Sequence, residues 1–184
     1  MSVGVVSVRY ARALLEYSIE ERVEDVMYKN MQRLAAVFVQ SKELLLLLQS
    51  PSLSNDGKTE LLCDVVEEPI EQYRRFVANV MKQGREELFR YIAYAYISLY
   101  RENKNIVSVK LTTSYVIDEQ LSQKIVDMVK SKYDTLNVEL DCTVDSSLIG
   151  GFVLEADSTR LAASVKGALS KIEKKIVDES RRLV

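Results

Sequence analysis

The chain has 184 residues, with 25 basic and 27 acidic side chains and a formal net charge of −2. This balance excludes a general electrostatic attraction to nucleic acid, which requires a basic face. Apolar residues make up 47% of the sequence, enough to bury a core in one medium domain or two small ones.

The chain contains no histidine, the residue that most often serves as general base or metal ligand. Ser-His and Cys-His nucleophile pairs are therefore excluded, which lowers the expectation of catalysis. Cys63 and Cys142 lie far apart and form no zinc or redox spacing, so we expect both to be buried, reduced thiols. We predict no catalytic residues, no metal site and no cofactor.

The longest apolar run is Leu44–Leu48, whereas a membrane-spanning helix needs about 20 residues. Arg9, Arg12 and Glu16 interrupt the apolar positions near the N-terminus, so no signal peptide is indicated. The sequence predicts a soluble protein that reaches a membrane only through a partner.

Up to about residue 104, apolar residues recur at three- and four-residue steps, which is typical of amphipathic helices. Ser54 is a predicted N-cap, Pro69 is expected in the first turn of the next helix, and Gly84 breaks the chain. The predicted helices cover residues 5–20, 23–38, 42–49, 55–66, 69–81 and 86–104. The apolar stripe of the first consists of Val6, Tyr10, Ala13, Leu14 and Tyr17. Short connections and the lack of a strand pattern predict a six-helix bundle over residues 1–105.

After Asn105 the period changes to two, which indicates strands. Asp118 is a predicted cap for a helix that ends at Tyr133, and a final long helix is expected from Ala162 to Val184. The predicted strands cover residues 107–111, 138–144, 152–156 and 159–161, and the last two should form a hairpin. The predicted fold is therefore mainly α, with a small α/β domain over residues 106–184 that contains a mixed sheet.

Few features suggest chemistry. Gly150 and Gly151 lack the Lys-Ser/Thr of a phosphate loop and precede a strand, which favours a turn with positive φ. A nucleotide-binding module built on these glycines stays as the less favoured alternative.

The carboxylates Asp141, Asp145, Glu155 and Asp157 are expected to face solvent. Most of the four tyrosines Tyr91, Tyr94, Tyr96 and Tyr100 are expected to be core or half-buried. The final helix has six basic and three acidic residues, which fits either a solvated face or a landing site for an acidic helix.

The stretch from Val138 to Glu155 consists of an alternating strand, an acidic residue, a Leu-Ile-Gly-Gly step and a second strand. This element resembles the signature of the δ subunits of F-type ATP synthases, the family of the mitochondrial oligomycin-sensitivity-conferring protein. Similar segments occur in the same order along almost the whole chain: Arg9–Leu14, Ser50-Pro51, Lys58–Leu62, Gln83–Arg85 and Arg160–Leu169. The motif residues are Val144, Asp145, Leu148, Gly150, Gly151, Ser164 and Gly167.

The resemblance implies a non-catalytic stator subunit that links the α/β catalytic head to the peripheral-stalk b subunits. The head would then resist rotor torque during proton-driven ATP synthesis. Since no organelle-targeting extension is seen, we expect a bacterial protein that lies peripherally on the cytoplasmic face of the inner membrane. A helical scaffold of another complex is the alternative.

The resemblance also implies where partners bind. The N-terminal helix of an α subunit would lie between the first and fifth helices, and the candidate residues there are Tyr10, Leu14, Tyr17, Tyr73, Phe76 and Val80. The b subunits would bind the C-terminal domain, where the candidates are Val165, Leu169, Ile172, Ile176, Lys171, Lys174 and Lys175.

Overall fold

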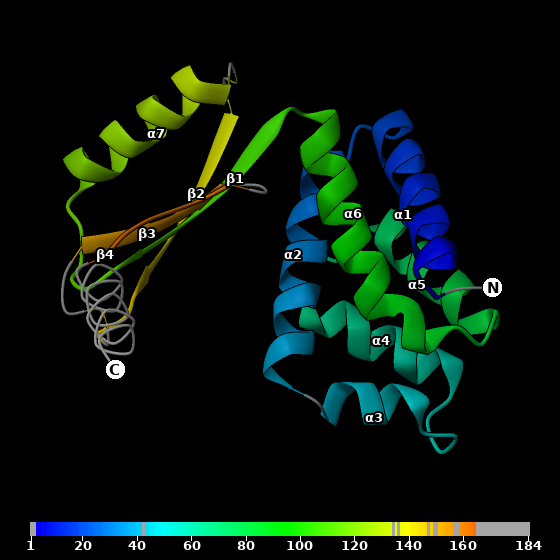
Figure 1. Ribbon diagram of the computed structural model, residues 1–184. Coiled ribbons are helices and arrows are strands. Elements are labelled where there is room, and N and C mark those ends of the chain that lie inside the picture. The colour runs from blue at the N-terminus through cyan, green and yellow to red at the C-terminus, as the bar shows by residue number, and fades with distance from the viewer. Residues whose placement is uncertain are drawn as a thin grey trace, which may run out of the picture. The chain divides into compact units, whose positions relative to one another are not determined.

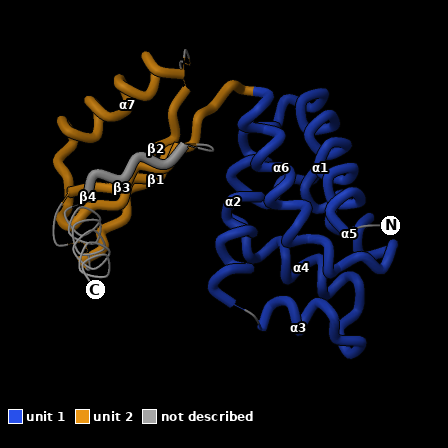
Figure 2. The backbone as a smooth tube through the Cα atoms, viewed as in Figure 1, with its two compact units in different colours: residues 1–103 blue, residues 104–184 orange. Residues whose placement is uncertain are grey.

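The computed structural model describes residues 3–41, 43–133, 135, 137–146, 148, 151–156 and 159–164. The chain divides into two compact units, Met1–Asn103 and Lys104–Val184 (Figure 2). The predicted boundary after residue 105 lies beside this division.

Within its described residues, the first unit holds six α-helices, in the number and order predicted (Figure 1). They are α1 (Val3–Glu20), α2 (Glu24–Gln40), α3 (Glu43–Gln49), α4 (Asn55–Val65), α5 (Glu71–Lys82) and α6 (Phe89–Asn103), with a 3-10 turn, η1 (Glu86–Leu88), before the last. No helix among the described residues is long and apolar enough to cross a membrane.

The helix starts follow local hydrogen-bonding chemistry. The Ser54 hydroxyl accepts a hydrogen bond from the Gly57 amide at 3.1 Å, which confirms the predicted cap of α4. The prediction for Pro69 was wrong, because α5 begins only at Glu71. Extended Ile70 is its N-cap, and the Ile70 amide bonds back to the Glu68 carbonyl, so Pro69 lies outside the helix.

The core of this unit forms where α1 and α2 pack along α6. Buried hydrogen bonds reinforce the packing: the hydroxyls of Ser18 and Tyr96 lie 2.9 Å apart, and burial raises the pKa of Tyr96 to about 12. Tyr100 stacks on Tyr28 and donates to Asp25 at 2.7 Å. Tyr96 and Tyr100 are thus core residues, whereas Tyr91 and Tyr94 are more than 40% exposed, so the prediction for these four tyrosines holds for two of them.

One shielded ion pair holds α4 against η1. The Lys58 Nζ lies 2.8 Å from the Glu86 Oε1, and the two side chains are only 7% and 18% exposed. Burial acts to raise the pKa of the Glu86 carboxyl, but the Lys58 hydrogen bond, a backbone hydrogen bond and the Lys58 charge outweigh it. The pKa of Glu86 is therefore held below its ordinary value, which favours the ionised pair.

The second unit contains a four-stranded mixed sheet in the order β2-β1-β3-β4. Its elements are β1 (Ile106–Thr113), α7 (Glu119–Tyr133), β2 (Asn137–Val144), β3 (Gly151–Ala156) and β4 (Thr159–Ser164). β1 runs parallel to β2 and antiparallel to β3, and β3 and β4 form the predicted antiparallel hairpin. Helix α7 is the crossover between the parallel strands and covers one face of the sheet around Val109, Val129 and Ala156 (Figure 1).

Two predictions for this unit need correction. Residues 162–164 continue β4, where they pair with β3, so the final helix does not begin at Ala162. The remainder of that predicted helix, residues 165–184, lies outside the described residues. Cys142 is exposed rather than buried, because it lies in the second half of edge strand β2, beyond the Val138 and Leu140 that pack under α7.

We predict that the Lys58–Glu86 pair makes stability depend on acid pH. Because the folded pKa of Glu86 is depressed, its contribution is full above the unfolded value of about 4.3 and is lost as pH falls through the folded pKa. Glu86→Gln should lower the free energy of unfolding by about 1–3 kcal/mol at pH 7, because Lys58 is left buried and unpaired. Urea unfolding from pH 7 to pH 3 measures this. An equal difference between variant and wild type at both ends of the range would contradict it.

Candidate helix-binding groove

The buried side of helix α1 combines small and large residues. Ser7, Ala11 and Ser18 are all at most 1% exposed, and Leu14 and Leu15 are buried beside them. The serine hydroxyls donate to backbone carbonyls of Val3 and Leu15, so both are satisfied within α1. Because these side chains are small, α1 can lie close to α6, and most of the predicted apolar stripe remains outside the core.

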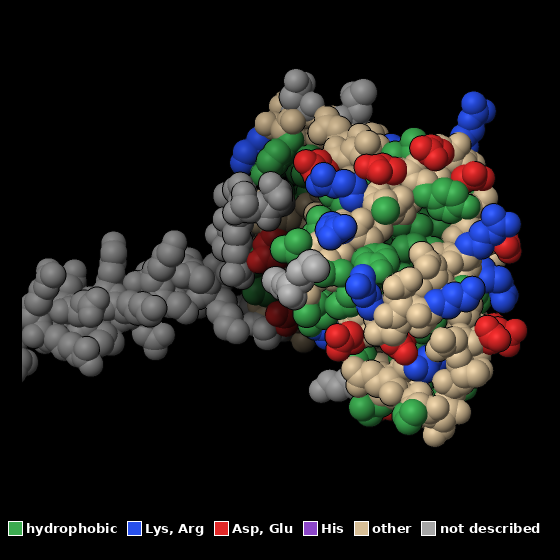
Figure 3. Space-filling model, turned by 90° about the vertical axis from the view of Figure 1, so that its right-hand side faces the viewer, with side chains coloured by type: hydrophobic (Ala, Val, Ile, Leu, Met, Phe, Trp, Pro, Cys, Tyr) green, Lys and Arg blue, Asp and Glu red, His purple; other side chains and the backbone are tan. Residues whose placement is uncertain are grey.

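That stripe lines a groove between α1 and α5. The two helices approach each other at few points, whereas α1 lies closely along α6. A cavity of about 380 Å³ opens there, lined by Tyr10, Ala13, Leu14, Tyr17, Arg75, Phe76 and Asn79. A second cavity of about 320 Å³ shares Tyr10 and Ala13 and extends the groove to Val6, Arg9 and Arg85. On the side of the first unit that carries α1 and α5, a band of hydrophobic side chains lies among charged ones (Figure 3).

Aromatic rings form the floor of the groove. The Tyr10 ring meets the Phe76 ring edge-on at a centroid distance of 6.5 Å. Phe76 meets the fully buried Phe89 of α6 in the same way, at 6.4 Å. The half-buried rings of the groove are thus anchored to the core, which fixes their positions before any partner arrives.

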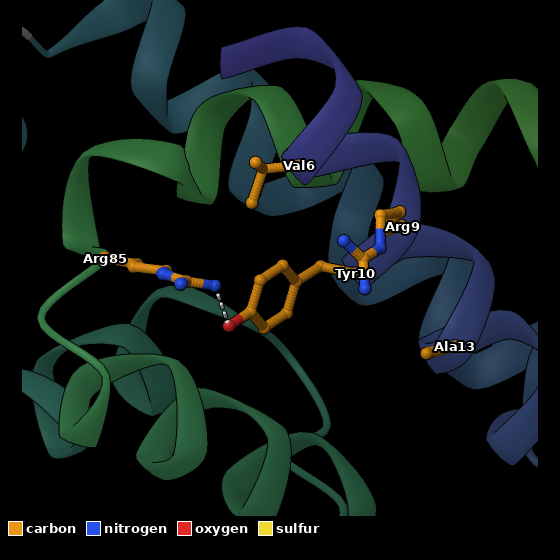
Figure 4. Close-up of a pocket in the computed structure, with 5 residues that line it drawn as sticks. All are labelled: Val6, Arg9, Tyr10, Ala13 and Arg85. Carbon is orange, nitrogen blue, oxygen red and sulfur yellow. Dashed lines mark hydrogen bonds between the residues drawn. The ribbon is translucent and has the colours of Figure 1, made fainter. Parts of the chain in front are cut away.

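Arg85 lies at one end of the groove. Gly84 follows the end of α5 with a φ of +62°, a left-handed conformation that side chains disfavour, and it turns the chain back towards α1. The Arg85 guanidinium then lies 5.5 Å from the Tyr10 ring centroid and donates to the Tyr10 hydroxyl at 2.7 Å (Figure 4). The Gln-Gly-Arg segment therefore has a defined geometric effect: it ends α5 and places a cation on the α1 stripe.

Of the six groove residues named from the sequence, Tyr10, Leu14, Tyr17 and Phe76 line the cavity, although Leu14 is only 2% exposed and belongs mainly to the core. Tyr73 and Val80 do not, because both are 0% exposed. The Tyr73 hydroxyl donates to the Leu62 carbonyl at 3.0 Å, so this side chain ties α5 to α4. Sequence reasoning missed the polar edge of the groove, namely Arg9, Arg75, Asn79 and Arg85. These residues adjoin or lie a few positions from the predicted apolar residues in the sequence, and this spacing could have indicated them.

The second unit has an apolar opening of its own, between α7 and the sheet. Its volume is about 260 Å³, and its lining residues are Leu111, Thr113, Tyr115, Ile117, Leu121, Ile125, Met128, Gly151, Phe152 and Leu154. Leu121 and Phe152 are more than one third exposed, and Met128 is 59% exposed. The predicted inner face of α7 is therefore only partly covered.

The other candidates named from the sequence are the glycines and carboxylates of the second unit. Gly151 has a φ of +84°, as the turn interpretation predicted, and begins a strand rather than a helix. Asp141 is exposed, Asp145 and Glu155 are half-buried, and no group of three potential metal ligands gathers in the part of the chain that the structure describes. Gly150, Asp157 and the candidate stalk residues from Val165 to Ile176 lie outside the described residues.

The fold and groove define a class of two-unit proteins whose helical unit presents a preformed apolar channel of the kind that accepts an amphipathic helix. A family model described as ATP synthase delta (OSCP) subunit matches residues 6–176. The "ATP synthase subunit delta" of Phocaeicola vulgatus is 34% identical and that of Bacteroides fragilis 33%, each over the full length of both chains. A chain from the Toxoplasma gondii mitochondrial ATP synthase hexamer shares the fold, with a TM-score of 0.68 over 93% of this chain and 97% of that one, at 19% identity.

The chain belongs to the ATP synthase delta (OSCP) subunit family.

We predict opposite outcomes for the same substitution on the two faces of α1. Ala11→Leu should lower the free energy of unfolding by about 1–3 kcal/mol, because Ala11 is 0% exposed and overpacking separates α1 from α6. Ala13→Leu should change it by less than about 0.5 kcal/mol, because Ala13 is exposed at the groove. Chemical denaturation of both variants measures the difference. Equal losses would mean that the two faces of α1 are assigned wrongly.

Proposed function

We propose that this chain is the stator subunit that connects the catalytic head of a rotary F-type ATP synthase to its peripheral stalk, without catalysing a reaction itself. Family membership over the full chain supports the assignment to the complex. The open groove between α1 and α5 is the observation that carries the binding mechanism. The protein works as a peripheral subunit on the cytoplasmic face of a bacterial inner membrane.

The first unit acts as one six-helix bundle that binds the N-terminal helix of an α subunit. Three properties of the groove support this. It is lined mainly by apolar and aromatic side chains, it is bordered by charges, and its Phe76 ring already packs against Phe89. An amphipathic helix laid into such a channel buries its apolar face without rearranging the bundle, which lowers the cost of binding.

The second unit binds the C-terminal ends of the b subunits. The apolar opening beneath α7 supports this, since Leu121, Met128 and Phe152 are apolar side chains left in contact with solvent. The candidate residues Val165, Leu169, Ile172 and Ile176 would add an apolar stripe, and Lys171, Lys174 and Lys175 would attract acidic partner side chains.

The groove assignment predicts which single substitutions weaken head binding. Tyr17→Ala and Phe76→Ala should each weaken binding of a synthetic α-subunit N-terminal peptide about tenfold or more, because aromatic anchors dominate such interfaces. Tyr94→Ala and Val39→Ala are matched controls, since both side chains are exposed and neither lines the groove. Isothermal titration calorimetry measures affinity, and thermal unfolding checks that each variant is folded. Binding that is equally strong in all four variants would contradict the site.

The stalk assignment predicts an effect on rate. Replacing Lys171, Lys174 and Lys175 together by glutamine should slow association with the soluble C-terminal part of the b subunits about fivefold at low salt, with a smaller change in dissociation. A Lys29→Gln, Arg33→Gln variant removes exposed cations from α2 as a control. Surface plasmon resonance separates the two rates. Unchanged association in the triple variant would remove these lysines from the stalk site.

A further inference from the structure

The α1–α5 groove carries opposite charges at its two ends. Helices α1 and α5 run antiparallel along it, because Arg85, after the end of α5, bonds to Tyr10, whereas Gln72 at the start of α5 bonds to Glu21 after the end of α1. One end is thus formed by the beginning of α1 and the turn after α5, and the other by the end of α1 and the beginning of α5.

The end near the start of α1 is basic. Arg9 and Arg85 line the cavity there (Figure 4), and Lys82 is exposed in the last turn of α5. Among the described residues, neither arginine forms an ion pair with a carboxylate. Arg85 uses a donor on the Tyr10 hydroxyl, but a guanidinium has five N–H donors and prefers a charged, bidentate acceptor.

The opposite end carries the exposed carboxylates Glu16, Glu20, Glu21 and Glu71, beside the exposed cations Arg22 and Arg75. Glu16 and Glu20 follow Arg9 and Ala13 at three- and four-residue steps, so they continue the same edge of α1. Both are exposed, as is Glu21 beyond the helix. Arg75, the cation that lines the groove near this end, is already bonded to Glu71 at 2.9 Å.

We propose that the groove selects a helix by the polarity of its charge, with a partner carboxylate bound by Arg85 and Arg9 at the basic end. This inference rests on the proposed function and specifies the chemistry of the helix that the groove accepts. The carboxylate binds beside the apolar Val6 and the Tyr10 ring, so the exposed guanidinium groups can meet it while the apolar face of the helix rests on the groove. A helix placed in the reverse direction would bring its carboxylate against Glu16 and Glu20. The charges thus fix the direction and register of a helix that the apolar floor alone would hold in several ways.

The test uses the full-length protein and the synthetic N-terminal peptide of the α subunit of the same ATP synthase, extended by one tryptophan. The protein contains no tryptophan, so the fluorescence belongs to the peptide alone. The variants Arg9→Gln and Arg85→Gln are compared with Arg12→Gln and Arg74→Gln, which remove exposed cations that do not line the groove.

Each groove variant should weaken peptide binding about fivefold in low salt, and the double variant should lose most of the salt dependence seen in the wild type. The controls should bind like the wild type. A double variant whose affinity and salt dependence match those of the controls would overturn the inference. If Phe76→Ala still weakens binding of the peptide in that case, the proposed function is retained. If the peptide does not bind the wild-type protein, the inference and the proposed function are both wrong.

A charge-reversal experiment identifies the partner atom. Arg85→Glu should weaken binding of the natural peptide more than Arg85→Gln does. Among peptides in which each acidic residue in turn is replaced by lysine, one should regain most of the lost affinity for Arg85→Glu. Absence of any such rescue, with every variant still folded by circular dichroism, would also overturn the proposal.

Discussion

The structure of the first unit depends on how closely α1 can approach α6. Ser7, Ala11 and Ser18 are the small residues of its buried side, beside Leu14 and Leu15, and the serine hydroxyls are satisfied within α1 or by Tyr96. Larger side chains at these three positions would hold α1 away from α6, which would displace the wall that α1 gives to the groove. The core contact and the open binding surface are therefore two consequences of one arrangement of side chains on α1.

The other wall of the groove depends on how α5 ends. The left-handed Gly84 lets the chain reverse after Gln83, and the next residue reaches the Tyr10 ring. The Gln-Gly-Arg segment thus combines two roles: Gly84 adopts the left-handed turn, and this turn places Arg85 against Tyr10. The Phe76 ring at the floor of the groove packs against the buried Phe89, so core packing holds the ring in place.

Sequence patterns predicted the elements better than their faces. Local chemistry predicted the caps at Ser54 and Asp118 and the mixed sheet. The order of the helices followed from the helical period of apolar residues in roughly the first 100 positions. On the buried side of α1 the predicted stripe included only Leu14, because serine and alanine carry a weak hydropathy signal beside Tyr10 and Tyr17. Likewise, alternation in β2 predicts an inner face but not how far α7 covers it, so Cys142 was misassigned. Both failures concern tertiary packing, which periodicity does not encode.

A tether under torque needs slow dissociation, which apolar burial supplies, and a correct orientation, which apolar burial does not. The groove separates these requirements in space. Tyr10, Tyr17 and Phe76 offer contact area along its length, and Arg9 and Arg85 line one end of it. By helical spacing, the exposed Glu16 and Glu20 continue the Arg9 edge of α1 towards the other end. Surface charges contribute little to affinity, so their polarity can be tuned without loosening the anchor. On the proposed function, this arrangement lets the bundle reject a misdirected helix during assembly and still hold the correct one under load.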